Sequence, residues 1–306
     1  MTAKHVRKTR DPIRQLEANA KNVMGYARDQ QKLGKRAVSE HYRTELAMAK
    51  ALVAALTYMG MALWGNRGQQ RMFPADWLRA DGQQNADILL GLTFCQLANY
   101  AYSAVDLVEK GLDAPARAVV RSAAELSSMI VVLVGNREAF QVYARDDASL
   151  DDKQKWYELF SDRKMAAQLA HIETRLGLPA NWVEFMRGFR RENSEFLSEA
   201  VHHSFRSIVA GLMPTVRDTD GVDLALLGGP NGKSGHTLGH LVTCIMVCLQ
   251  STFATVAKVY GFPPAVEKWD FFSAGLDIFS EVEPVFSEWL KEAETDPKRM
   301  VAPLNF

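Results

Sequence analysis

The stretch LDAPARAVVRSAAELSSMIVVLV, residues 112–134, decides the fold of this chain. Its pattern predicts a helix that is apolar on nearly every side, and a helix of that kind is normally buried. Arg117, Arg121 and Glu125 nevertheless follow one another at four-residue steps, and Ser128 continues the same stripe. An unpaired buried charge is costly, so we expect Arg121 and Glu125 to be paired or to line a wet cavity.

The rest of the chain shows the same helical periodicity and no convincing strand alternation. We therefore predict an all-α fold, a helical bundle with an N-terminal helical extension. The helices are expected at residues 11–33, 39–64 after a break at Gly34, 85–110, 113–134 with Asp113 as N-cap, 137–145, 149–176 starting at Ser149, 180–204, 236–260 and 266–293.

Two glycine-rich and proline-containing segments, residues 65–82 and 213–235, are predicted loops, and the second is expected to be the most mobile element. The apolar faces of the second half need the hairpin formed by residues 88–134. We therefore predict an extension over residues 1–82 and one bundle domain over residues 83–306.

The composition narrows the possible partners. Basic and acidic residues balance at 36 each, so no net field attracts nucleic acid or phospholipid over long range. The three cysteines form no disulfide framework and the N-terminus has no apolar signal core, so we expect a cytoplasmic protein. The most apolar segments are interpreted as core helices with no membrane contact. The first 36 residues lean basic, which fits either a solvated helix face or a contact surface for a protein partner.

A second polar stripe lies near the end of the helix expected at residues 180–204. It consists of Ser194, Ser198 and His202, with His203 beside it. If it faced the stripe of residues 112–134, a carboxylate, two guanidinium groups, a hydroxyl and an imidazole would combine acid–base chemistry with an anion clamp. The alternative is a buried polar network that only fixes the register of the helices.

Part of this pattern resembles a known family. The residues are Gly111-Leu112, Ala116-Arg117, Arg121-Ser122 and Glu125, followed by Phe196-Leu197-Ser198 and Val201-His202. Over residues 85–260 they are similar to a bacterial family of helical domains of unknown function. The resemblance implies that Arg121, Glu125, Ser198 and His202 are its recurring polar positions, but it implies no activity.

That family is in turn reminiscent of the HEPN domains, many of which are metal-independent ribonucleases in toxin and phage-defence systems. Their signature is an Arg followed, after four to six residues, by a His. The chain departs from it, because Arg191 lies too far from His202 and the match from Arg36 to His41 falls outside the similar segment.

Two functions therefore remain open. As a defence-associated RNA-cleaving effector, the protein would use His202, Glu125 and Arg121 in catalysis and Arg117, Ser198, His203 and Lys233 in substrate binding, with no cofactor. As a non-catalytic module, the same pocket would hold a small anion or lock the bundle. We expect a homo-oligomer in either case.

Two further motifs imitate a phosphate-binding loop and a metal site, but their spacing does not fit either one. The stretch from Gly228 to Ser234 imitates a phosphate-binding loop, but Leu227 stands where the first glycine is needed, so a flexible hinge with Lys233 as part of a lid is the better prediction. His236, His240, Cys244 and Cys248 climb one helix in steps of four, and such a ladder is too long for all four to hold one metal. No metal site is expected.

Overall fold

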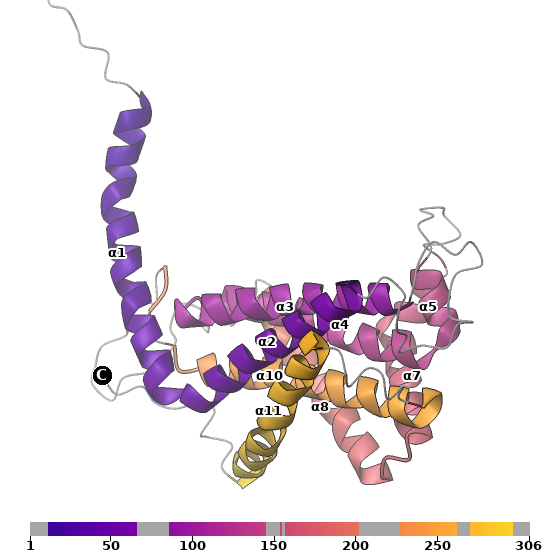
Figure 1. The fold of residues 1–306 in the computed structure, drawn as a ribbon. Coiled ribbons are helices and arrows are strands. Elements are labelled where there is room, and N and C mark those ends of the chain that lie inside the picture. The colour runs from indigo at the N-terminus through magenta and orange to yellow at the C-terminus, as the bar shows by residue number, and fades with distance from the viewer. Residues whose placement is uncertain are drawn as a thin grey trace, which may run out of the picture.

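The fold is all-α, as predicted. The computed structural model describes residues 12–65, 86–144, 154, 157–201, 227–229, 231–261 and 270–295, and no strand occurs among them. The helices are α1 (Pro12–His41), α2 (Arg43–Gly65), α3 (Ala86–Glu109), α4 (Asp113–Gly135), α5 (Arg137–Tyr143), α7 (Asp162–Arg175), α8 (Ala180–Val201), α10 (Ser234–Thr255) with a π-helical end (Val256–Tyr260), and α11 (Asp270–Thr295). They form a bundle from which α1 projects (Figure 1).

The predicted break at Gly34 is wrong, because α1 runs through this residue and ends at His41. A Cβ atom at Gly34 would lie 3.0 Å from the carbonyl oxygen of Gly229 and 3.1 Å from the nitrogen of Gly111. The glycine therefore allows backbones to approach closely rather than ending the helix. The chain bends instead at Tyr42, which is buried and donates a hydrogen bond to the carbonyl of Gly232 at 2.9 Å.

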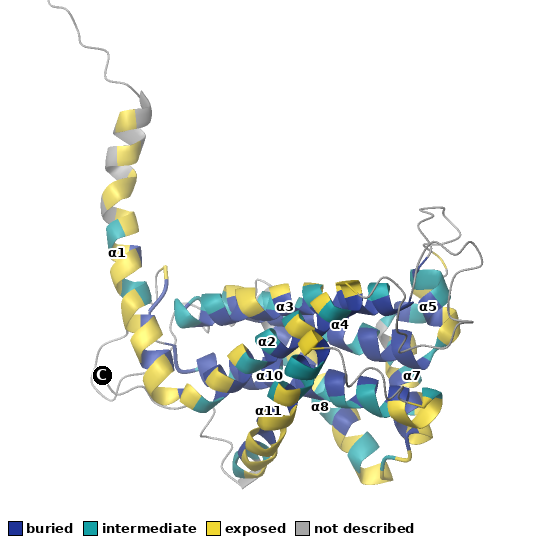
Figure 2. Cartoon of the chain, viewed as in Figure 1, coloured by how far each residue is buried: buried dark blue, intermediate teal, exposed yellow. Residues whose placement is uncertain are grey.

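Helix α2 lies inside the bundle. It packs most extensively against α3 and α11, and α2 and α3 approach closely where Gly60 meets Gly91, since a Cβ at Gly60 would lie 3.0 Å from the Gly91 carbonyl. The part that projects from the bundle is thus α1 alone, and its outer length is largely exposed (Figure 2). The domain division at residue 82 and a partner for the basic N-terminal segment stay predictions.

Helix α4 is central, with contacts to α3, α5, α7, α8 and α10. Its bounds agree with the predicted helix, but the cap does not. Leu112 occupies the N-cap position, and Asp113 lies in the first turn with its side chain buried. A carboxylate in the first turn is favoured by the helix dipole, and here it also becomes available for contacts between helices.

The described parts of the predicted mobile loop are packed into the bundle. Gly228 and Gly229 are buried, and the Gly229 nitrogen donates to the Lys110 carbonyl at 3.3 Å. Gly111 has a φ of +72°, and a Cβ there would lie 1.7 Å from the Gly229 oxygen. The hinge prediction therefore fails for residues 227–229, because this glycine contact fixes the loop against the turn between α3 and α4. Residues 213–226 lie outside the described part.

The long helix expected to end near residue 176 is interrupted at Ser161, where the chain bends before α7. Its predicted end is confirmed, because α7 stops at Arg175 and Gly177 adopts a φ of +72°. The expected start at Ser149 lies outside the described residues.

Four helices, α2, α3, α4 and α10 with its π-helical end, are long and apolar enough to cross a bilayer by length and composition. Within the bundle, 44% to 67% of the most apolar window of each is buried. They pack against one another and supply most of the hydrophobic core. The expectation of a cytoplasmic protein without membrane contact is not tested by these features.

Candidate functional site

A pocket of about 490 Å³ lies between α4, α7, α8 and α10. Its volume is in the range of small-molecule sites, about 300–1,000 Å³. The interior is mainly apolar, and charged side chains from α4, α7 and α8 line it as well. The charged lining residues are Arg121, Glu125, Glu173, Arg187, Arg190, Arg191 and Glu195, and the polar Asn193 and the apolar Met165, Leu169, Met186, Leu197 and Val247 also line the pocket.

Helix α4 contributes Arg121, Glu125 and Ser128, three members of the stripe predicted from the sequence. The Arg121 Nε donates to Glu125 Oε1 at 2.9 Å. The expectation that these two side chains are paired or line a cavity is confirmed in both respects. They are not deeply buried, however, since the Arg121 side chain is 34% exposed and that of Glu125 is 60% exposed.

A second ion pair joins α7 to α8. The Arg190 guanidinium contacts both carboxylate oxygens of Glu173, at 2.6 Å and 3.1 Å. Glu173 is almost fully buried, and the two-pronged geometry holds it in one orientation. This pair fixes one wall of the pocket and neutralises the Glu173 charge.

Arg187 and Arg191 also line the pocket, one turn apart on α8, and both are exposed. Neither has an ion-pair partner within the part of the chain that the structure describes. Like charges four residues apart on a helix repel each other weakly, and an anion bound between them would remove that cost. These two guanidinium groups are therefore available to a ligand.

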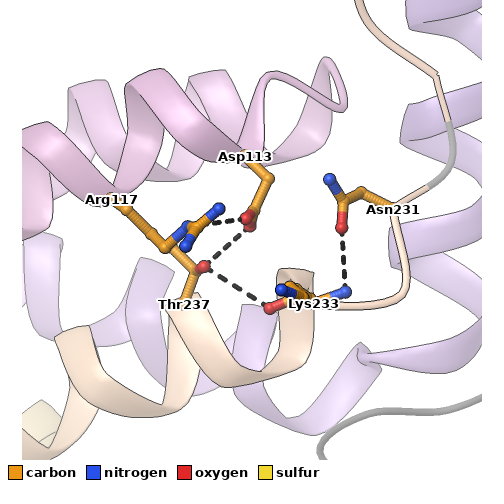
Figure 3. A network of polar contacts seen from close by, with 5 residues as sticks. All are labelled: Asp113, Arg117, Asn231, Lys233 and Thr237. Atoms are coloured by element: carbon orange, nitrogen blue, oxygen red, sulfur yellow. Dashed lines mark hydrogen bonds and ion pairs between the residues drawn. The ribbon is translucent and has the colours of Figure 1, made fainter. Parts of the chain in front are cut away.

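Arg117 lies elsewhere, in the interior between α4 and α10 (Figure 3), with Phe196 of α8 beside it. Its Nε lies 3.0 Å from Asp113 Oδ2, and the Thr237 hydroxyl donates to Asp113 Oδ1 at 2.7 Å. Its guanidinium lies 5.1 Å from the centre of the Phe196 ring. Arg117 is 1% exposed and does not line the pocket, and none of its guanidinium nitrogens forms a hydrogen bond with a described residue, so its role in fixing helix register stays a prediction.

Of the other predicted residues, Ser194 lines the pocket, whereas Ser198 and Lys233 do not. Ser198 is half-buried on α8. Lys233 occupies the N-cap position of α10, where its backbone nitrogen donates to Asn231 Oδ1 at 2.9 Å (Figure 3). His202 and His203 lie outside the described residues, so the expected contact between Glu125 and His202 stays a prediction.

Of the four residues spaced by four on α10, the two histidines nearest its N-terminus take part in an aromatic stack. The rings of His236 and His240 are 5.2 Å apart, and Phe196 lies 4.7 Å from His240. Burial lowers the pKa of His236, and burial together with the neighbouring His236 lowers the pKa of His240 to about 3. Among the described residues, no group of three His, Cys, Asp or Glu side chains is placed to hold a metal ion.

The two cysteines of the ladder are inert at neutral pH. Burial raises the pKa of Cys244 and of Cys248 to about 12. The Asn193 Nδ2 donates to the Cys244 sulfur at 3.1 Å and opposes part of that rise. A thiol that stays protonated is neither a strong nucleophile nor a metal ligand.

The sequence prediction missed the α7 and α8 side of the pocket. The helix that carries Ser194 also carries three arginines: Arg190 and Arg191 follow Arg187 by three and four residues, and they precede Ser194 by four and three. This spacing could have placed them beside the predicted stripe. Glu173 gives no such signal, because a single carboxylate on an amphipathic helix is ordinarily solvated.

No family model, curated protein or solved structure matches this chain. The resemblance that the sequence suggested therefore stays a prediction.

Proposed function

We propose that the protein binds a small organic anion with an apolar body in the pocket between α4, α7, α8 and α10. The observation that carries the proposal is the pairing of an apolar interior with two arginines, Arg187 and Arg191, with which no described carboxylate forms an ion pair. Arginine forks suit carboxylate and phosphate groups, and apolar walls suit an uncharged tail.

The ion pairs of the pocket support this choice. Arg121 is held by Glu125 and Arg190 by Glu173, so these four side chains shape the walls and cancel one another's charge. Glu195 also lines the pocket, so four arginines face three glutamates and the lining keeps a net positive charge, although the chain as a whole is neutral. A compact anion is attracted at short range, while a long polyanion gains little from such a small patch.

The apolar walls set the second requirement. Met186 and Leu197 are almost fully buried, and Leu169 lies beside them. The Oδ1 of Asn193 is buried without a hydrogen-bond partner among the described residues. A ligand that buries an aliphatic or ring body against these side chains and donates one hydrogen bond to Asn193 would complete the site.

Calorimetric titration with octanoate and with 1-octanol tests the proposal, since the two probes share a tail and differ in charge. We expect octanoate to bind at one site per chain, and the double variant Arg187→Gln/Arg191→Gln to weaken it about tenfold or more while leaving octanol unchanged. Arg163→Gln, at an exposed arginine of α7 outside the pocket, is the matched control. Equal octanoate affinity in the double variant and the control would refute the proposal.

RNA cleavage by a HEPN-like effector remains the second candidate, and the position of Arg121 and Glu125 at the pocket favours keeping it. It predicts that total RNA in expressing cells is degraded, and that Glu125→Gln prevents this while the protein melts at an unchanged temperature. Intact RNA in cells that express the soluble, folded protein would remove this candidate and leave anion binding unaffected.

A further inference from the structure

A second pocket, of about 200 Å³, lies between α8, α10 and α11. A cavity of about 150 Å³ with apolar walls is enough to hold benzene, so the space suits a small ring. Its walls are largely aromatic. The residues that carry the argument are Trp182, Phe185 and Phe189 from α8, His240 from α10, and Phe286 and Trp289 from α11.

The aromatic walls are held in place. Phe286 and Trp289 stack with ring centres 5.9 Å apart, and both are buried. The Trp289 Nε1 donates to the buried carboxylate of Glu45 at 2.8 Å, which anchors α11 to α2. On the opposite side, Trp182 and Phe185 lie 5.5 Å apart. Phe286 and Trp289 thus give a fixed aromatic face on α11, and Trp182 with the exposed Phe185 adds rings from α8, an arrangement that favours a flat occupant able to stack on the rings or meet them edge to face.

One polar atom in this pocket lacks a partner. His240 Nδ1 is buried and makes no hydrogen bond within the described residues. The ring is stacked on Phe189 at 5.7 Å and stays uncharged, since burial and His236 lower its pKa to about 3. In the neutral tautomer with its proton on Nε2, Nδ1 is the acceptor, and a buried acceptor left unpaired is costly.

The remaining walls exclude charged occupants. Among the residues that the structure describes, no Asp, Glu, Lys or Arg side chain lines the pocket, and an ion placed there would lose its hydration without a counter-charge. We propose that this pocket binds an uncharged planar aromatic molecule that carries one hydrogen-bond donor, of the phenol or indole type, with the donor directed at His240 Nδ1. The site adjoins the arginine-lined pocket, with which it shares Met186, Phe189 and Val247, but it takes a ligand of different chemistry and does not depend on the proposed function.

Calorimetric titration with phenol and toluene tests the inference, because these probes have the same shape and differ in the donor. We expect phenol to bind at one site per chain and toluene to bind about tenfold more weakly. His240→Phe keeps a ring in the stack but removes the acceptor, so it weakens phenol about tenfold and leaves toluene unchanged. His171→Phe, at an exposed histidine of α7, is the matched control and changes neither affinity.

Ala293→Phe provides a second variant, because Ala293 lines the pocket on α11 and a larger side chain there fills the space. It abolishes binding of both probes, and the half-exposed position leaves the fold intact. Equal affinity of the unaltered protein for phenol and toluene would overturn the assignment of His240. If Ala293→Phe still binds phenol, the assignment of phenol to this pocket is wrong. This second test does not require that His240→Phe folds.

Discussion

The buried histidine of the aromatic stack makes the stability of the protein depend on pH. Burial and the neighbouring His236 lower the pKa of His240 to about 3 in the folded protein, whereas the unfolded chain keeps the ordinary value of 6.5. Between these values the unfolded chain binds the proton and the folded protein does not, so the free energy of unfolding falls as the pH falls. The full stability is present above pH 6.5, and the loss begins as the pH drops through that value.

The size of the effect follows from the pKa values. Each pH unit inside the window costs about 1.4 kcal/mol, so lowering the pH from 7 to 5 removes about 2 kcal/mol through His240 alone. His236 adds to the loss in the same direction, because its pKa is also lowered by burial. Most carboxylates titrate below this range, which keeps the measurement specific.

Urea unfolding at pH 7 and pH 5 measures this loss. We expect His240→Phe to reduce the pH-dependent loss by about 2 kcal/mol, because the unfolded chain no longer gains that proton. His171→Phe, at an exposed histidine, keeps the full loss and is the control. If the unaltered protein and His240→Phe lose the same free energy between the two pH values, His240 is not buried in its neutral form.

Two predictions concern the buried contacts that hold α4 in place. Asp113→Ala leaves Arg117 buried without its counter-charge and destabilises the protein by about 3–5 kcal/mol in urea unfolding, and a loss below about 1 kcal/mol would contradict the buried network. Gly111→Ala and Gly177→Ala place the same side chain at the same φ of +72°, but only at Gly111 would the Cβ meet Gly229, at 1.7 Å. The first therefore costs several kcal/mol and the second about 1–2 kcal/mol, and equal melting temperatures would show that the glycine contact is absent.

Hydrophobic periodicity was sufficient to predict the helices of this protein. The all-α class, the bounds of α3, α4 and α5, and the end of α7 before Gly177 all follow from local sequence, because side chains that repeat every turn report directly on a helix. Local sequence misled at Gly34, where a residue that ordinarily weakens a helix allows two distant backbones to meet.

Only the tertiary structure decided which charged side chains share a site. The stripe on α4 predicted a polar surface, but it did not show that Arg117 turns inward to Asp113 while Arg121 and Glu125 face a pocket. The helices α7 and α8 supply Glu173, Arg187 and Arg191, and nothing local to those residues specifies their neighbours. Periodicity fixes the face of a helix on which a residue lies, whereas the packing of the whole bundle fixes what that face meets.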